Sequence, residues 1–358
     1  RLIYYIYIYI YIYYINKIKI FFILFSIIVI FIVIYLILLN QLVVLYDFKY
    51  ETRLKKNYNK KIDVVYTWVN DKDTKWLSKK NKYKKHIPKD TNKYHNSFEN
   101  NNEIIYSVFS VKKYMPWVNH IYIVTDNQVP LLKDFDNITI IDHKEIIDNK
   151  YLPVFNSHAI ESNIHHIPQL SEYFIYMNDD LFINKPLFMS DFLNDDGRIK
   201  IQINNFCNKC LKKNDFGCLF QDSNLFGTYT WKTEDETHKN LNEFYKKNNR
   251  ATLRHTPLIA KRSILFELEK KFKKNHEDTS KSKFRKTSDI KWFLLFIYHE
   301  YYNNNAVVGS LRSLSLMEPY VPFLYSYFYL RAKKNNYEVF SLNQGNHEKF
   351  LKNKYGLN

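Results

Sequence analysis

The sequence is poor in glycine and cysteine. Six glycines among 358 residues argue against a glycine-rich loop as the cradle for a nucleotide phosphate. The three cysteines, Cys207, Cys210 and Cys218, are one short of the four ligands of an ordinary structural zinc site. A disulfide between two of them, a zinc site completed by a His or Asp, and free thiols all stay open. Cysteine content therefore does not identify the compartment.

Negative charge is also in short supply. Lys and Arg total 53 against 36 Asp and Glu, which gives a net charge of +17. Such an excess suits an anionic partner, whether a nucleotide, a phosphate, a lipid surface or a nucleic acid. The lysines are scattered rather than gathered on one motif, so a general bias toward Lys and Asn explains the total as well.

One long hydrophobic run stands near the N-terminus. Ile20–Leu45 contains no charged residue, and about 20 apolar residues span a bilayer as a helix. The run exceeds the apolar region of a cleaved signal peptide, so we interpret residues 20–45 as a retained transmembrane anchor. Residues 1–19, in which Tyr and Ile alternate, form a low-complexity segment to which we assign no function. Residues 46–61 form a basic stem, and we expect no nucleic-acid partner behind the anchor.

The pattern of residues 62–358 is typical of an α/β domain. Apolar, β-branched runs that predict strands alternate with amphipathic runs that predict helices. This alternation predicts a mainly parallel sheet with helices on both faces. The predicted strands are Ile62–Trp68, His120–Thr125, Ile138–Ile141 and Tyr173–Met177, and the predicted helices are Asn102–Met115, Ser157–Ile167, Ser263–Phe272 and Ile290–Tyr298.

Acidic residues follow two of the predicted strands. Asn178-Asp179-Asp180 comes directly after one strand, and Asp71 and Asp73 follow another. The carboxyl ends of parallel strands meet at one edge of a sheet, where ligands bind in open α/β folds. Carboxylate oxygens suit hard divalent cations, so this edge is a candidate metal site, although a solvated turn has the same composition.

Histidines mark two further candidate sites. The predicted helix Ser157–Ile167 would place His158, Glu161 and His165 on one face, at spacings i, i+3 and i+7. That face suits a metal site, a polar network or a solvated stripe. His255, just before the predicted helix Ser263–Phe272, is a candidate catalytic base or a structural histidine.

Arg285 precedes the apolar helix Ile290–Tyr298. A guanidinium in this position is suited to bind a phosphate through two parallel hydrogen bonds. Pairing with Asp289 is the alternative.

Taken together, the motifs form four blocks between Ile62 and about Gly345. In these blocks the chain resembles the Stealth family, which includes bacterial capsular polysaccharide phosphotransferases and the catalytic subunit of the eukaryotic N-acetylglucosamine-1-phosphotransferase. The blocks are Ile62–Asn70 with Asp73 and Trp76; Glu103 through Pro116-Trp117-Val118 and Ala159-Ile160-Glu161-Ser162 to Asn178-Asp179-Asp180; His255-Thr256-Pro257 with Phe284-Arg285 and Asp289-Ile290; and, faintly, Phe340-Ser341-Leu342-Asn343.

The resemblance implies a GT-A-like nucleotide-sugar transferase core preceded by one transmembrane helix. It implies a UDP-sugar donor, a glycan or glycoprotein acceptor, a divalent metal (Mg²⁺ or Mn²⁺) and release of UMP. The group transferred is then N-acetylglucosamine-1-phosphate or a related hexose phosphate. The implied location is the Golgi or secretory pathway, with a lumenal catalytic domain. The assembly we expect, if the chain associates with itself, is a homodimer.

The resemblance also suggests roles for particular residues. The catalytic candidates are His255, Arg285, Asp180 and Glu161, with His255 as the base and Asp180 as the alternative base. The metal candidates are Asp179 and Asp180, and the substrate-binding candidates are Thr67, Trp68, Asn70, Asp73, Ser157 and Asn178.

Two rival functions stay open from sequence alone. A GT-A glycosyltransferase would attack the sugar carbon and release UDP, using the same donor. An inactive, membrane-anchored sugar-binding protein is the other, because Phe109 and Gln344 depart from the residues usual in the family.

Overall fold

The computed structural model describes residues 2–47, 55–83, 100–132, 135–203, 237, 239–246, 253–317, 337–343 and 348–356. It divides the chain into two compact units, Arg1–Arg53 and Leu54–Asn358. Gln344 and the three cysteines, Cys207, Cys210 and Cys218, lie outside the described residues.

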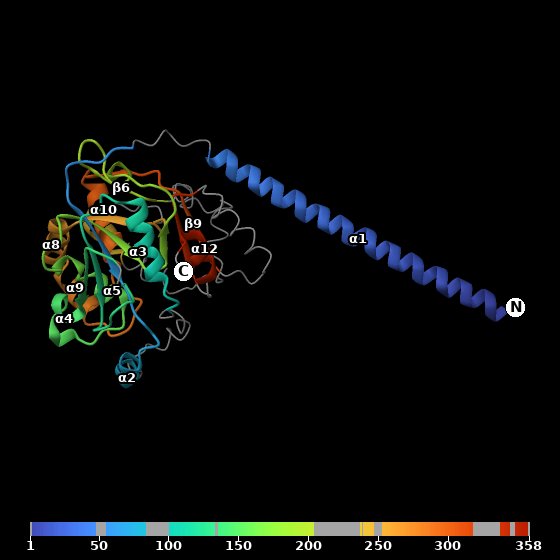
Figure 1. The fold of residues 1–358 in the computed structure, drawn as a ribbon, viewed down its shortest axis with the longest axis horizontal. Coiled ribbons are helices and arrows are strands. Elements are labelled where there is room, and N and C mark those ends of the chain that lie inside the picture. The colour runs from blue at the N-terminus through green and yellow to red at the C-terminus, as the bar shows by residue number, and fades with distance from the viewer. Residues whose placement is uncertain are drawn as a thin grey trace. The chain divides into compact units, whose positions relative to one another are not determined.

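The first unit holds one long helix, α1 (Leu2–Asp47), drawn in blue in Figure 1. Its segment Tyr13–Tyr35 is long and apolar enough to cross a membrane, which fits either an anchor or a signal sequence. The Tyr and Ile repeat belongs to the same helix rather than forming a separate element. The boundaries proposed for the anchor and the stem stay predictions.

The second unit is built on a five-stranded sheet in the order β3-β2-β1-β4-β7. Its first four strands are parallel, as the sequence predicted, and β7 is an antiparallel edge strand. Because β1 is covered on both faces, it is mostly apolar, and Val64, Val65 and Tyr66 are fully buried. The strands are β1 (Ile62–Thr67), β2 (Ile121–Thr125), β3 (Ile138–Asp142), β4 (Tyr173–Asn178) and β7 (Leu258–Lys261).

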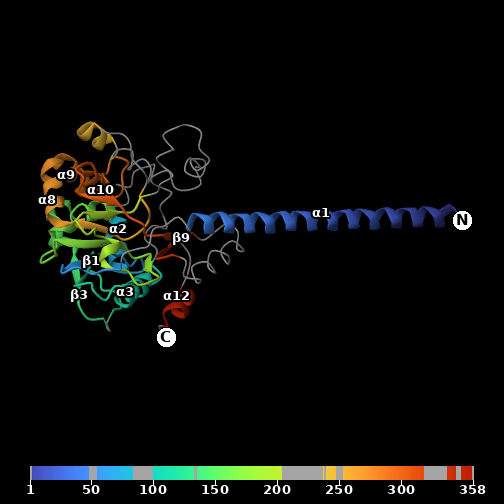
Figure 2. The same ribbon diagram turned by 90° about the horizontal axis from the view of Figure 1, so that it is seen from above.

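Helices lie on both sides of this sheet, with α3 on one side and α8, α9 and α10 on the other (Figure 2). Residues Ile104, Val108 and Val111 of α3 are buried, as their spacing predicted. The longer helices of this unit are α2 (Thr74–Lys82), α3 (Glu103–Tyr114), α8 (Arg262–Lys271), α9 (Lys273–Ser280) and α10 (Trp292–Tyr302).

Two smaller sheets and further helices are also described in this unit. A three-stranded sheet joins β5 (Leu181–Ile183), β10 (Val339–Asn343) and β9 (Ser313–Met317), and β6 (Ile199–Ile201) pairs with β8 (Ala306–Val308). The faint fourth block, Phe340–Asn343, lies on β10, which pairs with β5. Because β5 begins directly after Asp180, the block is brought close to the acidic end of β4. Other helices among the described residues are α4 (His143–Ile146), η3 (Asn149–Tyr151), α5 (Ser157–Glu161), η4 (Ile164–His166), η5 (Met189–Asp191) and α12 (Glu348–Tyr355).

The predicted helix Ser157–Ile167 is wrong in its length. The α-helix ends at Glu161, and a separate 3₁₀ turn, η4, follows. The Ala159 carbonyl accepts hydrogen bonds from the Ser162 hydroxyl at 2.9 Å and from the Asn163 side-chain amide at 2.8 Å. A continued helix would offer that carbonyl to the backbone N–H of Asn163, so side chains that bind the backbone locally end the helix here.

Candidate active site

Asp180 and His255 meet because β7 runs antiparallel to β4. The register pairs Tyr176 with Leu258, so the chain just before β7 returns to the carboxyl end of β4. There His255 Nε2 lies 3.1 and 3.3 Å from the two carboxylate oxygens of Asp180. Burial lowers the pKa of His255, but the nearby charge and hydrogen bond of Asp180 outweigh it, so the net pKa is raised.

Asp179 lies beside this pair and is half-buried. Burial, together with the negative charges of Asp180 and Glu103, raises the pKa of Asp179 to about 8. A divalent cation would relieve this repulsion, and the available donors are the hard carboxylate oxygens that Mg²⁺ and Mn²⁺ prefer. Asp179 and Asp180 therefore fit the metal that the sequence predicted here.

Arg285 reaches the amino end of α5. Its Nη2 donates to the Ser157 hydroxyl at 2.7 Å. The alternative partner, Asp289, instead accepts from the Asn156 side chain at 2.8 Å and from the Lys286 backbone N–H at 2.7 Å. The guanidinium thus lies against Ser157 at the edge where the candidate residues gather.

A hydrogen-bonded chain links the ends of β1 and β4 to α5. Thr67 pairs with Asn178 in the strand register, and its hydroxyl lies 3.1 Å from the Tyr176 hydroxyl. Tyr176 donates onward to Glu161 Oε1 at 3.0 Å. Burial raises the pKa of Glu161, and the charge of Arg285 acts in the opposite direction. This carboxyl is therefore held at the end of a fixed polar chain.

Two residues of this neighbourhood were missed by the sequence reasoning. Tyr176 sits inside the predicted strand, where it was read only as an apolar residue. Lys291 directly follows Asp289-Ile290 of the third block, and its charge acts on Glu161 and His255. Lys291 thus adds a second positive charge beside Arg285, and only its neighbours in space reveal it.

Trp68, Asn70 and Asp73 belong to a second network, at the ends of β1 and β2. The backbone N–H of Asn70 donates to Gln128, and the indole of Trp68 donates to Asn100 at 3.3 Å. Asp73 caps α2 and accepts from Gln128 at 3.1 Å; this bond, with the capping amides, lowers its pKa. The hydrogen bonds described for these three residues do not join them to Asp180 or His255.

The single histidine face predicted for His158, Glu161 and His165 does not form, because the helix ends at Glu161. His165 Nε2 lies 2.7 Å from Glu269, while Glu161 contacts Tyr176. His158 Nδ1 is 4.0 Å from Asp289 and buried. The three side chains therefore point to different partners.

A different cluster has the spacing of a metal site. Among the described residues, one group of three or more His, Cys, Asp and Glu has ligand atoms all within 4.8 Å of one another: His165, His166 and Glu269. The sequence grouped His165 with His158 and Glu161, whereas its partner Glu269 lies 104 residues away on α8.

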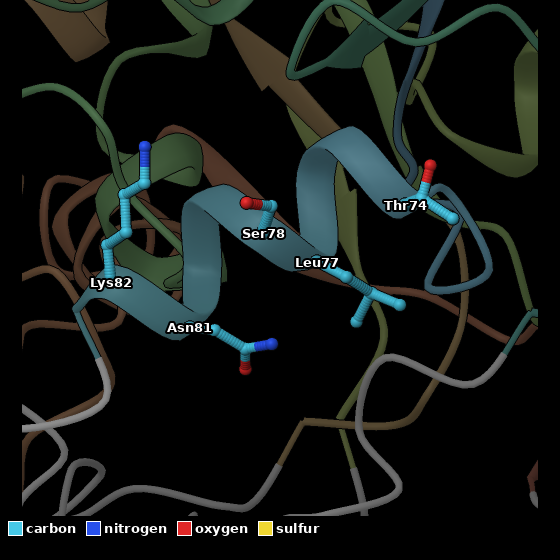
Figure 3. A pocket seen from close by; sticks show the side chains of 5 residues that line it. All are labelled: Thr74, Leu77, Ser78, Asn81 and Lys82. Atoms are coloured by element: carbon cyan, nitrogen blue, oxygen red, sulfur yellow. The ribbon is translucent and has the colours of Figure 1, made fainter.

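A shallow hollow of about 570 Å³ lies along α2, lined by Thr74, Leu77, Ser78, Asn81 and Lys82 (Figure 3). It contains none of the predicted site residues, although Thr74 directly follows Asp73. We assign it no part in the chemistry.

Comparison with known proteins finds three conserved regions of Stealth proteins. Conserved region 1 matches residues 60–87, region 2 matches 97–201 and region 3 matches 254–303. These ranges contain the first three sequence blocks. The fourth block stays a prediction.

Curated relatives agree with this match. The chain is 37% identical to the capsular polysaccharide phosphotransferase fcs1 of Haemophilus influenzae over 283 residues, which cover 76% of this chain and 70% of that protein. It is 50% identical to the capsular polysaccharide phosphotransferase LcbA of Neisseria meningitidis over 143 residues, covering 38% of this chain and 39% of the relative. The chain thus spans well under half of the second relative.

Among solved structures, the galactosyltransferase LgtC aligns with 82% of this chain and 95% of its own, at 10% identity and a TM-score of 0.41. The bifunctional glycosyltransferase WbbM aligns with 86% of this chain and 51% of its own, at 9% identity and a TM-score of 0.41.

Proposed function

Because this chain belongs to the Stealth family, we propose that it is a transferase that moves a sugar-1-phosphate from a UDP-sugar to a hydroxyl of a glycan and releases UMP. The observation that carries the proposal is the meeting of Asp180 and His255 at the sheet edge that also holds Asp179. The proposed core is of the GT-A type, and the proposed group is N-acetylglucosamine-1-phosphate or a related hexose phosphate.

The proposed reaction is substitution at phosphorus. The acceptor hydroxyl attacks the β-phosphorus of the donor, and a new P–O bond forms. The bond from that phosphorus to the oxygen bridging it to the α-phosphorus breaks, and UMP leaves with the electron pair. His255 takes the hydroxyl proton, and Asp180, 3.1 Å away, orients the imidazole and stabilises its charged form.

Charge develops on the phosphate oxygens and on the departing UMP. Arg285 supplies a fixed positive charge at the amino end of α5, and Lys291 adds a second nearby. When bound at Asp179 and Asp180, a divalent metal adds Lewis-acid neutralisation of the diphosphate.

The remaining candidates orient the substrates. Glu161 is fixed by Tyr176, which is itself bonded to Thr67, so its carboxyl is positioned to accept bonds from sugar hydroxyls. Ser157 holds Arg285, and Asn178 ends β4 beside Thr67. We propose that Trp68, Asn70 and Asp73 contact the UDP-sugar donor. Gln128 holds the loop that carries them, through hydrogen bonds with Asn70 and Asp73.

The nucleotide product is the direct test. We expect the purified full-length chain in detergent, given UDP-N-acetylglucosamine, an oligosaccharide acceptor and Mn²⁺, to release UMP and form an acid-labile sugar phosphodiester. Chromatography separates UMP from UDP, and the phosphodiester gives a distinct ³¹P resonance. Release of UDP with a plain glycosidic product would make the chain a glycosyltransferase instead. No product with a panel of UDP-sugars and glycan acceptors would favour the inactive sugar-binding protein.

We also propose that α1 anchors the chain in a membrane of the Golgi or secretory pathway, with the catalytic domain in the lumen. The domain carries one glycosylation sequon after the anchor, Asn137-Ile138-Thr139, and Asn137 is exposed just before β3. A lumenal domain would present this asparagine to the glycosylation machinery.

For the full chain expressed in a eukaryotic cell, we expect a mobility shift on deglycosylation that Asn137→Gln abolishes. We expect the domain in sealed microsomes to resist protease until detergent is added. Digestion without detergent, together with no glycan at Asn137, would place the domain on the cytoplasmic side. Asn149→Gln, which alters an exposed asparagine outside any sequon, is the matched control.

A further inference from the structure

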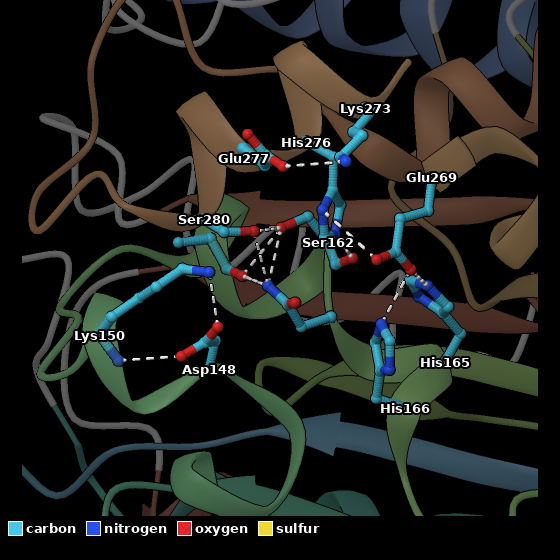
Figure 4. A network of polar contacts seen from close by, with 12 residues as sticks. Asp148, Lys150, Ser162, His165, His166, Glu269, Lys273, His276, Glu277 and Ser280 are labelled. Carbon is cyan, nitrogen blue, oxygen red and sulfur yellow. Dashed lines mark hydrogen bonds and ion pairs between the residues drawn. The ribbon is translucent and has the colours of Figure 1, made fainter. Parts of the chain in front are cut away.

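Three histidines surround the carboxylate of Glu269 on α8. His165 and His166 of η4 each direct Nε2 at Glu269 Oε2, at 2.7 and 2.8 Å. His276 of α9 directs Nδ1 at the other oxygen, Oε1, at 3.8 Å. Figure 4 shows these side chains converging from three separate elements.

The cluster is largely shielded from solvent. The side chain of His165 is fully buried, and that of His276 is 7% exposed. His166 and Glu269 remain about one-third exposed, at 34% and 27%. The cluster is therefore buried on the side of His165 and His276 and partly exposed on the side of His166 and Glu269.

The hydrogen bond made by His276 determines which of its two ring nitrogens carries the proton, and the nitrogen that faces Glu269 is the unprotonated one. Its Nε2 lies 2.8 Å from the Ser162 carbonyl, which only accepts, so Nε2 carries the proton. In the neutral imidazole, Nδ1 then presents a lone pair to the carboxylate oxygen, and 3.8 Å is too long for a hydrogen bond. Two acceptors that face each other are satisfied by a cation between them.

Metal-binding histidines commonly have this arrangement. A histidine that binds a metal through one nitrogen usually donates its other N–H to a carbonyl or carboxylate, which fixes the tautomer. The bond from His276 to Ser162 meets that description. The two imidazoles and one carboxylate that have metal-ligand spacing are a donor set that zinc accepts.

We propose that His165, His166 and Glu269 bind one Zn²⁺ ion at a site separate from the candidate active site, with the His276 imidazole beside them at Glu269 Oε1. These three protein ligands leave the fourth position of a tetrahedral zinc to a water molecule or, after a small movement, to the His276 imidazole. The ion would tie η4 to α8. Ser162, which His276 holds, directly follows Glu161, so the site would also steady the segment behind that active-site carboxyl.

Metal content is the test, and it does not depend on catalytic activity. The full-length chain in detergent is stripped with EDTA, equilibrated with Zn²⁺ and freed of unbound metal, and zinc per chain is measured by mass spectrometry. We expect Glu269→Gln to carry one zinc fewer than the parent chain. Zinc held by Cys207, Cys210 or Cys218 would be common to both proteins, so the difference isolates this site.

Two controls accompany the comparison. Glu277→Gln, an exposed carboxylate on α9 that pairs with Lys273, should keep the parent's zinc content. Asp278→Asn, an exposed carboxylate on α9 that pairs with Lys281, should keep it too. His166→Gln is the second test variant; its side chain is partly exposed, so the substitution disturbs the core less than one at His165.

Thermal melting gives an independent reading. Zinc that binds only the folded chain raises the melting temperature by mass action, and we expect a larger rise in the parent than in Glu269→Gln or His166→Gln. Equal zinc content in the parent and both variants would overturn the proposal, as would a parent chain that takes up no zinc. In either case the cluster would be a hydrogen-bonded network, and the proposed transferase function would be unaffected.

Discussion

Arg285→Ala is expected to lower kcat by about a hundredfold or more, the usual scale for removing one group that stabilises developing charge in a transition state. The fall in kcat should exceed any rise in KM, because the charge on the phosphate oxygens is greatest during transfer. The structure supports this by holding the guanidinium against Ser157, where it is fixed before substrate arrives. Initial rates at varied UDP-sugar concentration, with UMP as the product measured, separate the two parameters.

Arg198→Ala is the matched control for this variant. Arg198 is an exposed arginine that pairs with Asp196 at 2.7 Å, so its loss should leave both kinetic parameters unchanged. Arg285→Lys should recover only part of kcat, since an ammonium keeps the charge without the planar pair of donors. A wild-type kcat for Arg285→Ala, with UMP still released, would remove Arg285 from the proposed mechanism.

Asp180→Asn is expected to lose about 10²–10⁴ of kcat, the range seen when positioned acid–base catalysis is lost. Asparagine has the same shape as aspartate, so contact with His255 remains while the charge that supports its imidazolium is lost. The same change removes one of the two carboxylates proposed to hold the metal. Thermal stability should stay near that of the parent, because the substitution also relieves the repulsion between Asp179 and Asp180.

Asp278→Asn is the control, since Asp278 is an exposed carboxylate that pairs with Lys281 on the surface. Complete chelation with EDTA should abolish turnover in the parent, and Mg²⁺ or Mn²⁺ should restore it. If Mg²⁺ or Mn²⁺ restores turnover in the absence of Zn²⁺, the catalytic metal is distinct from the zinc proposed at Glu269. Activity that survives complete chelation would exclude the metal role of Asp179 and Asp180.

The sequence by itself determined the parallel part of the sheet and the acidic end of β4. Apolar, β-branched runs mark the buried strands β1, β2 and β4 and also the more exposed β3, so these four strands were found within one or two residues. Asn178-Asp179-Asp180 follows such a run directly, and its position at the sheet edge needs no knowledge of distant contacts. The candidate residues themselves, His255 and Arg285 included, were identified from the sequence blocks.

The tertiary structure decided which of these residues meet. Asp180 and His255 are 75 residues apart and come together because β7 adds to the sheet in the antiparallel sense, a choice not visible in a four-residue strand. Ser157 and Arg285 are 128 residues apart, and His165 and Glu269 are 104 apart. Hydrophobic periodicity shows only which face of a helix or strand is buried. Which distant residues come together depends on the path of the whole chain. The end of helix α5 at Glu161 also depends in part on a distant contact. Ser162 and Asn163, whose side chains end the helix, are hydrogen-bonded to Ser280 of α9.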